Sequence, residues 1–263
     1  MKDSNFQAYS EYYDLLYADK DYKAESEYIL GLLAGQYVPA PGSILELGCG
    51  TGAHAELFAE KGWSVHGIDM SPYMLERAHQ RAATSPHSAK LKFELGDVRN
   101  FRTDNRFDAV VSLFHVTSYQ TTNADLEAMF ETAARHLNSG GVFLFDFWYG
   151  PAVLSERPSV RVKRFSNERV SITRIAEPVL EDHNNVVEVQ YSISVRKGTD
   201  APVEMFEKHR MRYLFLPELE AMLKKYGFAS QTTMEWMSKA VPSLSTWAVS
   251  TVTKLTKTQI YRQ

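Results

Sequence analysis

A glycine-rich turn at residues 48–52 constrains the fold of this chain more than any other segment. It follows the short apolar run Ser43–Leu47 and precedes a helical pattern over Ala53–Lys61. Glycine has no Cβ and accepts positive φ, so a ligand can lie directly against the backbone where the helix begins. A buried strand, a glycine turn and a helix together predict the first unit of an α/β sheet that binds a small ligand.

Strand and helix patterns alternate after this turn. The apolar runs predicted as strands are Trp63–Ile68, Leu91–Leu95, Phe107–Phe114 and Val142–Phe147. The predicted helices run from Pro72, with Ser71 as N-cap, to about Ala83, and over Leu126–Leu137. This order predicts an α/β fold with a Rossmann-like, doubly wound, mostly parallel sheet over about residues 40–148.

The pattern changes in the segment 151–215. Period-two alternation, broken at Asn184–Asn185 and Gly198–Pro202, predicts antiparallel strands there. The elements predicted after it are a helix at Pro217–Tyr226 and strands at Ala229–Met237 and Thr246–Thr253. We therefore predict one domain made of residues 40–150 and 216–263, with the antiparallel segment inserted into it as a β lid or platform.

The glycine turn alone is compatible with two classes of ligand. Gly48, Gly50 and Ala53 satisfy the dinucleotide fingerprint G-x-G-x-x-G/A, so an NAD-dependent oxidoreductase is one candidate. Glu46, two positions before the first glycine, argues against it, because a carboxylate would repel a pyrophosphate. The same carboxylate suits a ligand that carries an ammonium group.

Two further acidic residues end the next predicted strands. Asp69 ends the second strand, where it can accept hydrogen bonds from both ribose hydroxyls, and Asp97 ends the third, where it can meet an adenine amino group. Together with Glu46 they describe a cationic adenosyl ligand without phosphates, which is S-adenosylmethionine. The alternative, that Glu46 and Asp97 are ordinary surface carboxylates, requires coincidences at successive strand ends.

The segments ELGCGTG, GIDMSPYMLERA and GDV resemble motifs I to III of the class I S-adenosylmethionine-dependent methyltransferases. The match covers about residues 40–148 and is specific for the superfamily rather than for an acceptor. The cofactor-site residues implied by the resemblance are Glu46, Gly48, Cys49, Gly50, Asp69, Met70, Asp97, Val98 and Leu113. It also implies that Met70 and Val98 enclose the adenine ring and that Leu113 lies under the methionine half.

A wider part of the chain is similar to the N,N-dimethyltransferases of nucleotide-linked aminodeoxysugars. The similar segments are Glu11–Ile29, Phe145–Trp148, Val170–Arg174 and Glu207–Arg210. This resemblance implies that residues 1–39 form a helical cofactor cover, that Tyr13 and Tyr22 fold over the cofactor, and that the 160–215 strands shape the acceptor pocket. The implied reaction is N-methylation of a nucleotide-linked amino sugar. Another small acceptor (an amino acid, an amine or a hydroxylated metabolite) and a non-catalytic binding module are the alternatives.

Three residues are candidates for the base that takes a proton from the acceptor. His115 and Tyr119 follow the fourth predicted strand, at the carboxyl edge where such sheets bind ligands. The aminosugar enzymes place a histidine in this segment, where the best ungapped alignment puts Tyr119. His209, in a strand-like run, is the third candidate, and a structural role is the alternative for both histidines. An amine acceptor must lose a proton before it attacks, and again before any second methylation.

Basic side chains of the inserted segment are candidates for contact with an acceptor's pyrophosphate. They are Arg157, Arg161, Lys163, Arg164 and Arg174. A solvated face of a lid strand is the alternative for these residues.

Composition and spacing limit the remaining possibilities. The net charge of −3 does not favour a nucleic-acid partner, and no cluster has metal-ligand spacing. We interpret the single cysteine, Cys49, as a small packed residue in a reducing compartment rather than as a nucleophile. The sequence lacks a secretory apolar region and any apolar stretch of about 18 residues, so we expect a cytoplasmic protein without membrane contact. The expected partner is a small-molecule acceptor, and the chain is compatible with a homodimer.

Overall fold

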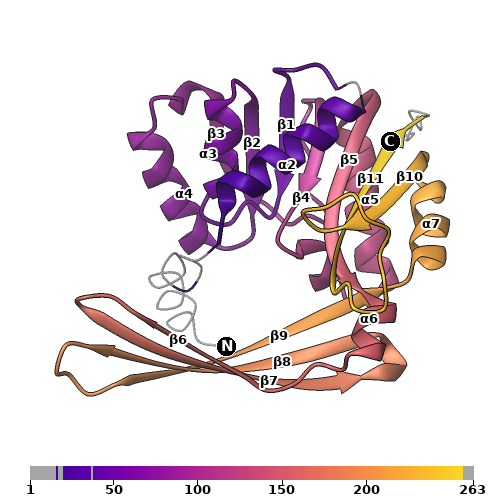
Figure 1. Ribbon diagram of the computed structural model, residues 1–263. Helices are drawn as coiled ribbons and strands as arrows, with labels where there is room; N and C mark the ends of the chain where they lie inside the picture. The colour runs from indigo at the N-terminus through magenta and orange to yellow at the C-terminus, as the bar shows by residue number, and fades with distance from the viewer. Residues whose placement is uncertain (1–15, 17–19, 37, 257–263) are drawn as a thin grey trace.

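A parallel sheet forms the centre of the protein. The computed structural model describes residues 16, 20–36 and 38–256. The strands follow the order β3-β2-β1-β4-β5, and each neighbouring pair is parallel (Figure 1). Their bounds are Ser43–Leu47 for β1, Ser64–Asp69 for β2, Leu91–Leu95 for β3, Phe107–Ser112 for β4 and Leu137–Tyr149 for β5. The strand order reverses between β1 and β4, and such a reversal places a ligand site at the carboxyl ends of these two strands.

Two C-terminal strands extend this sheet in the antiparallel sense. β11 (Ala248–Leu255) pairs with β5, and β10 (Phe228–Glu235) pairs with β11. The chain therefore returns to the first sheet after the insertion. The predicted Rossmann-like, mostly parallel α/β fold is confirmed.

Helices cover both faces of the sheet. Their bounds are Tyr22–Gly35 for α2, Ala53–Glu60 for α3, Pro72–Thr84 for α4, Asn123–His136 for α5, Gly150–Ser155 for α6 and Leu216–Lys225 for α7. Ile44 of β1 joins the apolar core with α2, α3 and α4, whereas the next residue, Leu45, joins the core with α5 and α7. Side chains of a strand alternate between its faces, so one short buried strand supplies both cores. None of the described helices is both long and apolar enough to span a membrane.

Element boundaries match the prediction where local chemistry sets them. β1 and β3 have the predicted bounds. α4 begins at Pro72, and the Oγ of Ser71 accepts the backbone N–H of Met74 at 3.3 Å. A hydroxyl at the N-cap and a proline at the first helical position are therefore sufficient to fix this helix start.

Several other boundaries differ from the prediction, and for two of them the local cause is clear. α5 begins at Asn123, before the predicted start, because the Oγ1 of Thr122 accepts a backbone N–H of the first turn at 3.1 Å. β4 ends at Ser112, since Phe114 and His115 have φ values of 63° and 64°. Positive φ is incompatible with a strand, so the apolar run continues past the point where the strand stops.

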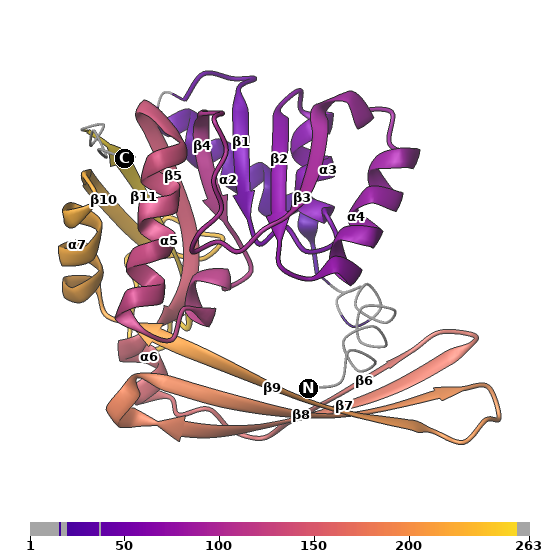
Figure 2. The ribbon, with the colours of Figure 1, turned by 180° about the vertical axis from the view of Figure 1, so that it is seen from behind.

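The segment after α6 forms an antiparallel platform, here defined as β6 to β9. The strand bounds are Arg161–Ser166 for β6, Val170–Glu181 for β7, Val186–Lys197 for β8 and Val203–Leu214 for β9. Neighbouring strands pair in the order in which they follow one another along the chain. The platform extends beneath the parallel sheet (Figures 1 and 2). It joins that sheet where Trp148 and Tyr149 of β5 pair with Tyr213 and Leu214 of β9.

One face of the platform, here called the inner face, packs against the rest of the chain. Near the strand tips Ile172 and Ile193 cluster with Leu16, and Met74 of α4 packs against this cluster. Near the junction with β5, Val187, Val189 and Tyr213 cluster with Val153 of α6.

Between these two apolar clusters the inner face is polar. Tyr191 and Glu207 are cross-strand neighbours, and His209 follows Glu207 by two residues on the same face of β9. Arg174 of β7 lies over the Tyr191 ring, 5.2 Å from its centroid. A polar patch enclosed by apolar packing is a place where a ligand can be oriented.

Candidate functional site

The glycine turn leaves room against the backbone at the carboxyl end of β1. Gly48 and Gly50 have φ values of 78° and 53°. A Cβ at Gly50 would meet no atom within 4 Å, whereas a Cβ at Gly48 would lie 2.6 Å from Val116. Gly50 is therefore open to a ligand, and Gly48 allows the chain to pass close to the loop after β4.

Asp69, at the end of β2, is held by the glycine turn. One carboxylate oxygen accepts the Gly50 N–H at 2.9 Å, and the other accepts the Ser71 N–H at 2.8 Å. Burial raises the pKa of Asp69, and these backbone hydrogen bonds oppose the rise. The carboxylate is fixed beside Gly50, where its remaining lone pairs can accept hydrogen bonds from two ribose hydroxyls.

Glu46 is a buried carboxylate with an unsatisfied oxygen. The residue is 1% exposed, and Oε2 has no hydrogen-bond partner. Burial, and after it the charge of Asp69, raises the pKa of Glu46 to about 8. A buried carboxyl group in this state gains most from a cation placed beside it, such as the ammonium group of a methionine moiety.

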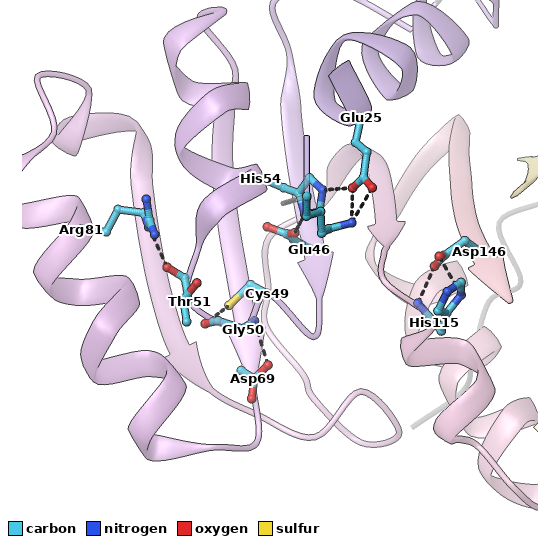
Figure 3. A network of polar contacts seen from close by, with 11 residues as sticks. Glu25, Glu46, Cys49, Gly50, Thr51, His54, Asp69, Arg81, His115 and Asp146 are labelled. Atoms are coloured by element: carbon cyan, nitrogen blue, oxygen red, sulfur yellow. Dashed lines mark hydrogen bonds and ion pairs between the residues drawn. The ribbon is translucent and has the colours of Figure 1, made fainter. Parts of the chain in front are cut away.

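A polar network links Glu46 to the N-terminal helix α2. The Nε2 of His54 lies 2.8 Å from Glu25 Oε2, and its Nδ1 lies 3.9 Å from Glu46 Oε1 (Figure 3). The Nζ of Lys20 also donates to the Glu25 carboxylate. Burial acts to raise the pKa of Glu25, but the hydrogen bonds from His54 and Lys20 outweigh it and lower this pKa. The network joins α2 to the start of α3 next to the Glu46 carboxyl group.

The other expected cofactor residues surround this turn. Asp97 accepts hydrogen bonds from Arg99 Nε at 2.9 and 3.0 Å, and these bonds lower the pKa of Asp97. Met70 is 69% exposed beside the end of β2, whereas Val98 and Leu113 are buried. These positions are compatible with the roles that the sequence predicts, and those roles stay predictions.

The remaining predicted cofactor residues are Tyr22, Cys49 and Tyr13. Tyr22 packs its ring edge-on against His54, with 4.9 Å between the ring centroids. Cys49 is buried within the turn, and burial raises the pKa of its thiol well above the ordinary value, which agrees with a packing role. Tyr13 lies outside the described residues.

His115 interacts with a buried aspartate of β5. Its backbone N–H donates to Asp146 Oδ1 at 2.8 Å, and its Nδ1 lies 3.0 Å from Asp146 Oδ2 (Figure 3). The ring nitrogen is within ion-pair distance of this oxygen but is not aligned for a hydrogen bond. Asp146 therefore stabilises the positive φ of His115 and holds its ring near the end of β4.

Tyr119 and His209 come together from distant parts of the chain. Tyr119 ends the short 3-10 helix η2 (Val116–Tyr119), and its hydroxyl lies 2.7 Å from the Nδ1 of His209 on β9. The Nε2 of His209 lies 2.9 Å from Glu207 Oε2. Two of the three predicted bases thus form a single hydrogen-bonded chain with Glu207, and His115 has a different partner.

The residues present fit an adenosyl cofactor with an ammonium group. The open position at Gly50 would let a nucleoside lie against the backbone, and the fixed carboxylate of Asp69 would bind its ribose. The unpartnered oxygen of Glu46 would bind the cation. Among the described residues, no group of three His, Cys, Asp or Glu side chains is placed to hold a metal ion.

Sequence reasoning did not assign roles to four residues of these networks. Glu25 and His54 support the cofactor carboxylate, Asp146 holds His115, and Glu207 holds His209. Glu207 lies in the segment Glu207–Arg210, which is similar to the aminosugar enzymes, but that similarity assigned it no role.

Comparisons with known proteins identify relatives of this chain. A family described as "Methyltransferase domain" matches residues 44–141. A dTDP-3-amino-3,4,6-trideoxy-alpha-D-glucopyranose N,N-dimethyltransferase of Streptomyces venezuelae is 31% identical over 189 residues, which cover 71% of this chain and 76% of the relative. A putative methyltransferase of Bacillus subtilis is 30% identical over 223 residues, covering 85% and 86%. The crystal structure of an S-adenosylmethionine-dependent methyltransferase from Clostridium acetobutylicum has a TM-score of 0.79 at 25% identity, covering 97% of this chain and 99% of that chain.

Proposed function

We propose that this chain, which belongs to the class I S-adenosylmethionine-dependent methyltransferases, methylates the nitrogen of an amino sugar carried on a nucleotide. When bound, S-adenosylmethionine supplies an activated methyl group. Gly50 and Asp69 would hold its adenosine part, and Glu46 would pair with its ammonium group. The protein's further task is to orient a neutral nitrogen toward that methyl group.

The observation that carries the proposal is the contact between Tyr119 and His209. Their atoms are 2.7 Å apart, although one residue follows the parallel strand β4 and the other belongs to the platform. The contact brings polar groups of the inner face to the edge of the sheet that binds the cofactor. The Streptomyces venezuelae relative, whose name places its methyl groups on the nitrogen of a dTDP-linked sugar, supports the choice of acceptor.

The platform also offers basic residues on the side that faces the rest of the chain. Lys163 of β6 is the cross-strand neighbour of Arg174, whose guanidinium lies over Phe165 and Tyr191. Side chains alternate along a strand, so Lys163 shares the inner face and Arg164 points to the outer face. We propose that residues 151–215 act as the acceptor lid, that Lys163 and Arg174 meet the nucleotide's pyrophosphate, and that α2, the described helix of the N-terminal segment, covers the cofactor.

Purified protein tests this function with three acceptor classes. A thymidine-diphosphate-linked amino sugar, the corresponding free amino sugar, and a panel of amino acids and hydroxylated compounds are incubated with S-adenosylmethionine, and products are identified by mass spectrometry. We expect mono- and dimethylated nucleotide sugar and much slower turnover of the free sugar. Methylation of a panel compound in preference to the nucleotide sugar would overturn the proposal.

A matched pair of variants tests the phosphate contact. Lys163→Gln is expected to raise the KM for the nucleotide sugar about fivefold, because an exposed ion pair contributes up to about 1 kcal/mol. Arg164→Gln, on the neighbouring residue of the opposite face, should leave KM unchanged. Equal effects of both substitutions would contradict the orientation we assign to the lid.

A further inference from the structure

A row of three buried polar side chains leads from helix α2 to the carboxyl group of Glu46. His54, in the middle of the row, lies in the first turn of α3 directly after the glycine turn and is 6% exposed. Its Nε2 lies 2.8 Å from Oε2 of Glu25 in the first turn of α2, and its Nδ1 lies 3.9 Å from Oε1 of Glu46 (Figure 3). Burying polar groups costs free energy that apolar packing would avoid, so the row indicates a function beyond packing.

The contact with Glu25 fixes which ring nitrogen of His54 carries a proton. Burial acts to raise the pKa of Glu25, but the hydrogen bonds from His54 and Lys20 outweigh it and lower this pKa, so Glu25 is a carboxylate that accepts. Burial lowers the pKa of His54, so the ring is neutral near pH 7 and its single proton lies on Nε2. The Nδ1 therefore presents a lone pair toward Glu46.

The charges that face His54 come from several elements. Glu25 of α2 and Asp146 of β5 favour a positive charge on the ring, whereas Lys20, which donates to Glu25, opposes one. Burial outweighs the two carboxylates. A cation bound beside Nδ1 would act in the same direction as Lys20 and keep the ring neutral.

The distance between His54 and Glu46 suits a shared donor. At 3.9 Å, Nδ1 and Oε1 are too far apart for a direct hydrogen bond. Two acceptors bonded to one ammonium group, each about 2.8 Å from its nitrogen, lie about 4–5 Å apart. The Oε2 of Glu46, which has no hydrogen-bond partner, offers the same group a further acceptor.

We propose that His54 and Glu46 together bind the ammonium group of S-adenosylmethionine, and that Glu25 of α2 positions the His54 ring for this contact. The inference rests on the proposed pairing of Glu46 with that group, to which it adds a neutral ring acceptor and a positioning residue. Docking of α2 and binding of the ammonium group then favour each other, because both use the same ring.

The first test compares two ligands that differ only in the amino group. S-adenosylhomocysteine carries this group, and its deaminated analogue has hydrogen in its place but keeps the carboxylate. His54→Phe preserves a ring that can stack on Phe58 and removes both nitrogens. We expect the Kd of S-adenosylhomocysteine to rise about tenfold and that of the analogue to stay within about twofold of wild type. An equal rise for both ligands, or no rise for either, would overturn the contact.

The second test separates Glu25 from general effects on α2. Glu25→Gln replaces the carboxylate by an amide that can itself donate to Nε2, so the ring proton is no longer held there. The Kd of S-adenosylhomocysteine should rise about fivefold, again without change for the analogue. Glu27→Gln is the matched control, since Glu27 is exposed on the same helix. Equal effects of the two substitutions would overturn the positioning role.

The third test uses the wild-type protein, so it also decides the matter if a variant fails to fold. The ¹⁵N shifts of the His54 ring, assigned by correlation to its backbone, report which nitrogen is protonated. We expect the Nε2–H form both without ligand and with S-adenosylhomocysteine bound. A ring protonated on Nδ1 in the bound state would overturn the proposal, because Nδ1 would then be a donor.

Hydrogen exchange tests the coupling to α2. S-adenosylhomocysteine should slow the exchange of the amides of buried Ile29 and Leu33 about tenfold more than its deaminated analogue does at equal saturation. Equal protection by both ligands would overturn the coupling.

These measurements contain no methyl acceptor, so a failure to methylate amino sugars would leave their outcome unchanged. Glu46→Gln isolates the remaining assumption. If this variant keeps the wild-type ratio of the two Kd values, the proposed pairing of Glu46 fails, and His54→Phe still decides whether the ring contacts the ammonium group.

Discussion

The cofactor side and the acceptor side of the site treat buried polar groups in different ways. On the cofactor side, Glu46 and Asp69 lie at the carboxyl ends of neighbouring parallel strands. Backbone N–H groups bond the oxygens of Asp69, whereas Glu46 Oε1 has His54 at 3.9 Å and Oε2 has no hydrogen-bond partner. On the acceptor side, Tyr119, His209 and Glu207 satisfy one another in a chain and leave one oxygen over.

The difference reflects how each side is built. The cofactor side is built from two strand ends that are close in sequence, namely Glu46 with the glycine turn after β1, and Asp69 at the end of β2. The acceptor side exists only when the platform meets the loop after β4. Changes in the platform can therefore alter the acceptor without disturbing the cofactor carboxylates.

The largest effect is expected from Asp69→Ala. Asp69 holds the turn, and we propose that it also accepts hydrogen bonds from the ribose hydroxyls, so its loss should weaken S-adenosylmethionine binding by about 2–3 kcal/mol, roughly 30- to 150-fold in Kd. Calorimetry on the folded variant measures the Kd for S-adenosylmethionine, with Asp104→Ala on the surface as control. Wild-type affinity would show that the cofactor side lies elsewhere.

Glu46→Gln is expected to weaken cofactor binding about tenfold above pH 8. In the wild-type protein Glu46 is largely protonated at neutral pH and must ionise to meet the ammonium group, so affinity should rise with pH up to about 8 and then level off. Calorimetry in buffers of different ionisation enthalpy should detect the release of about one proton at pH 7. The variant should release none; if it releases as many as wild type, Glu46 is not the partner.

The same substitution is expected to have the opposite effect on stability without cofactor. A carboxyl group whose pKa rises from 4.5 to about 8 on folding contributes stability that is full below pH 4.5 and is lost as the pH rises through about 8. Above pH 8, the free energy of unfolding of Glu46→Gln should therefore be about 1 kcal/mol higher than that of the wild type. Urea unfolding at pH 5 and pH 9 measures this difference in the free energy of unfolding. A Glu46→Gln variant less stable than wild type at pH 9 would contradict the expectation.

The smallest effect is expected when an acceptor-side change is measured on the cofactor side. Tyr119→Phe and Glu207→Gln should leave the Kd for S-adenosylmethionine within about twofold of wild type, since sites without shared partners behave additively. A larger change in either variant would show that the cofactor side and the acceptor side are coupled.

The elements that could be predicted from the sequence are those with local signals. Ser71 and Pro72 mark the start of α4, and the glycine turn marks the end of β1. The end of β4 could not be predicted, because the positive φ of His115 depends on a hydrogen bond to Asp146, which lies on another strand.

The candidate site divides in the same way. Glu46 and Asp69 were predicted because each follows from its place at a strand end. The pairing of Tyr119 with His209 was not, because the two are joined only by the docking of the platform, although each was a candidate alone. Glu207 was missed for a related reason, since an acidic residue in an alternating strand is ordinary until its partner is known.

The junction between β5 and β9 is short, so a tilt of the platform relative to the parallel sheet would pivot there. Tyr213 pairs with Trp148 at this junction, and His209 lies four residues away, about 13 Å along the strand. The far end of β9, at Val203, lies about 33 Å from the same point. A tilt of about 5° therefore moves His209 by about 1 Å and the tip by about 3 Å. His209 therefore lies on the part of β9 that such a tilt displaces least, and the tip is held by the packing of Ile172 and Ile193 against Leu16 and Met74.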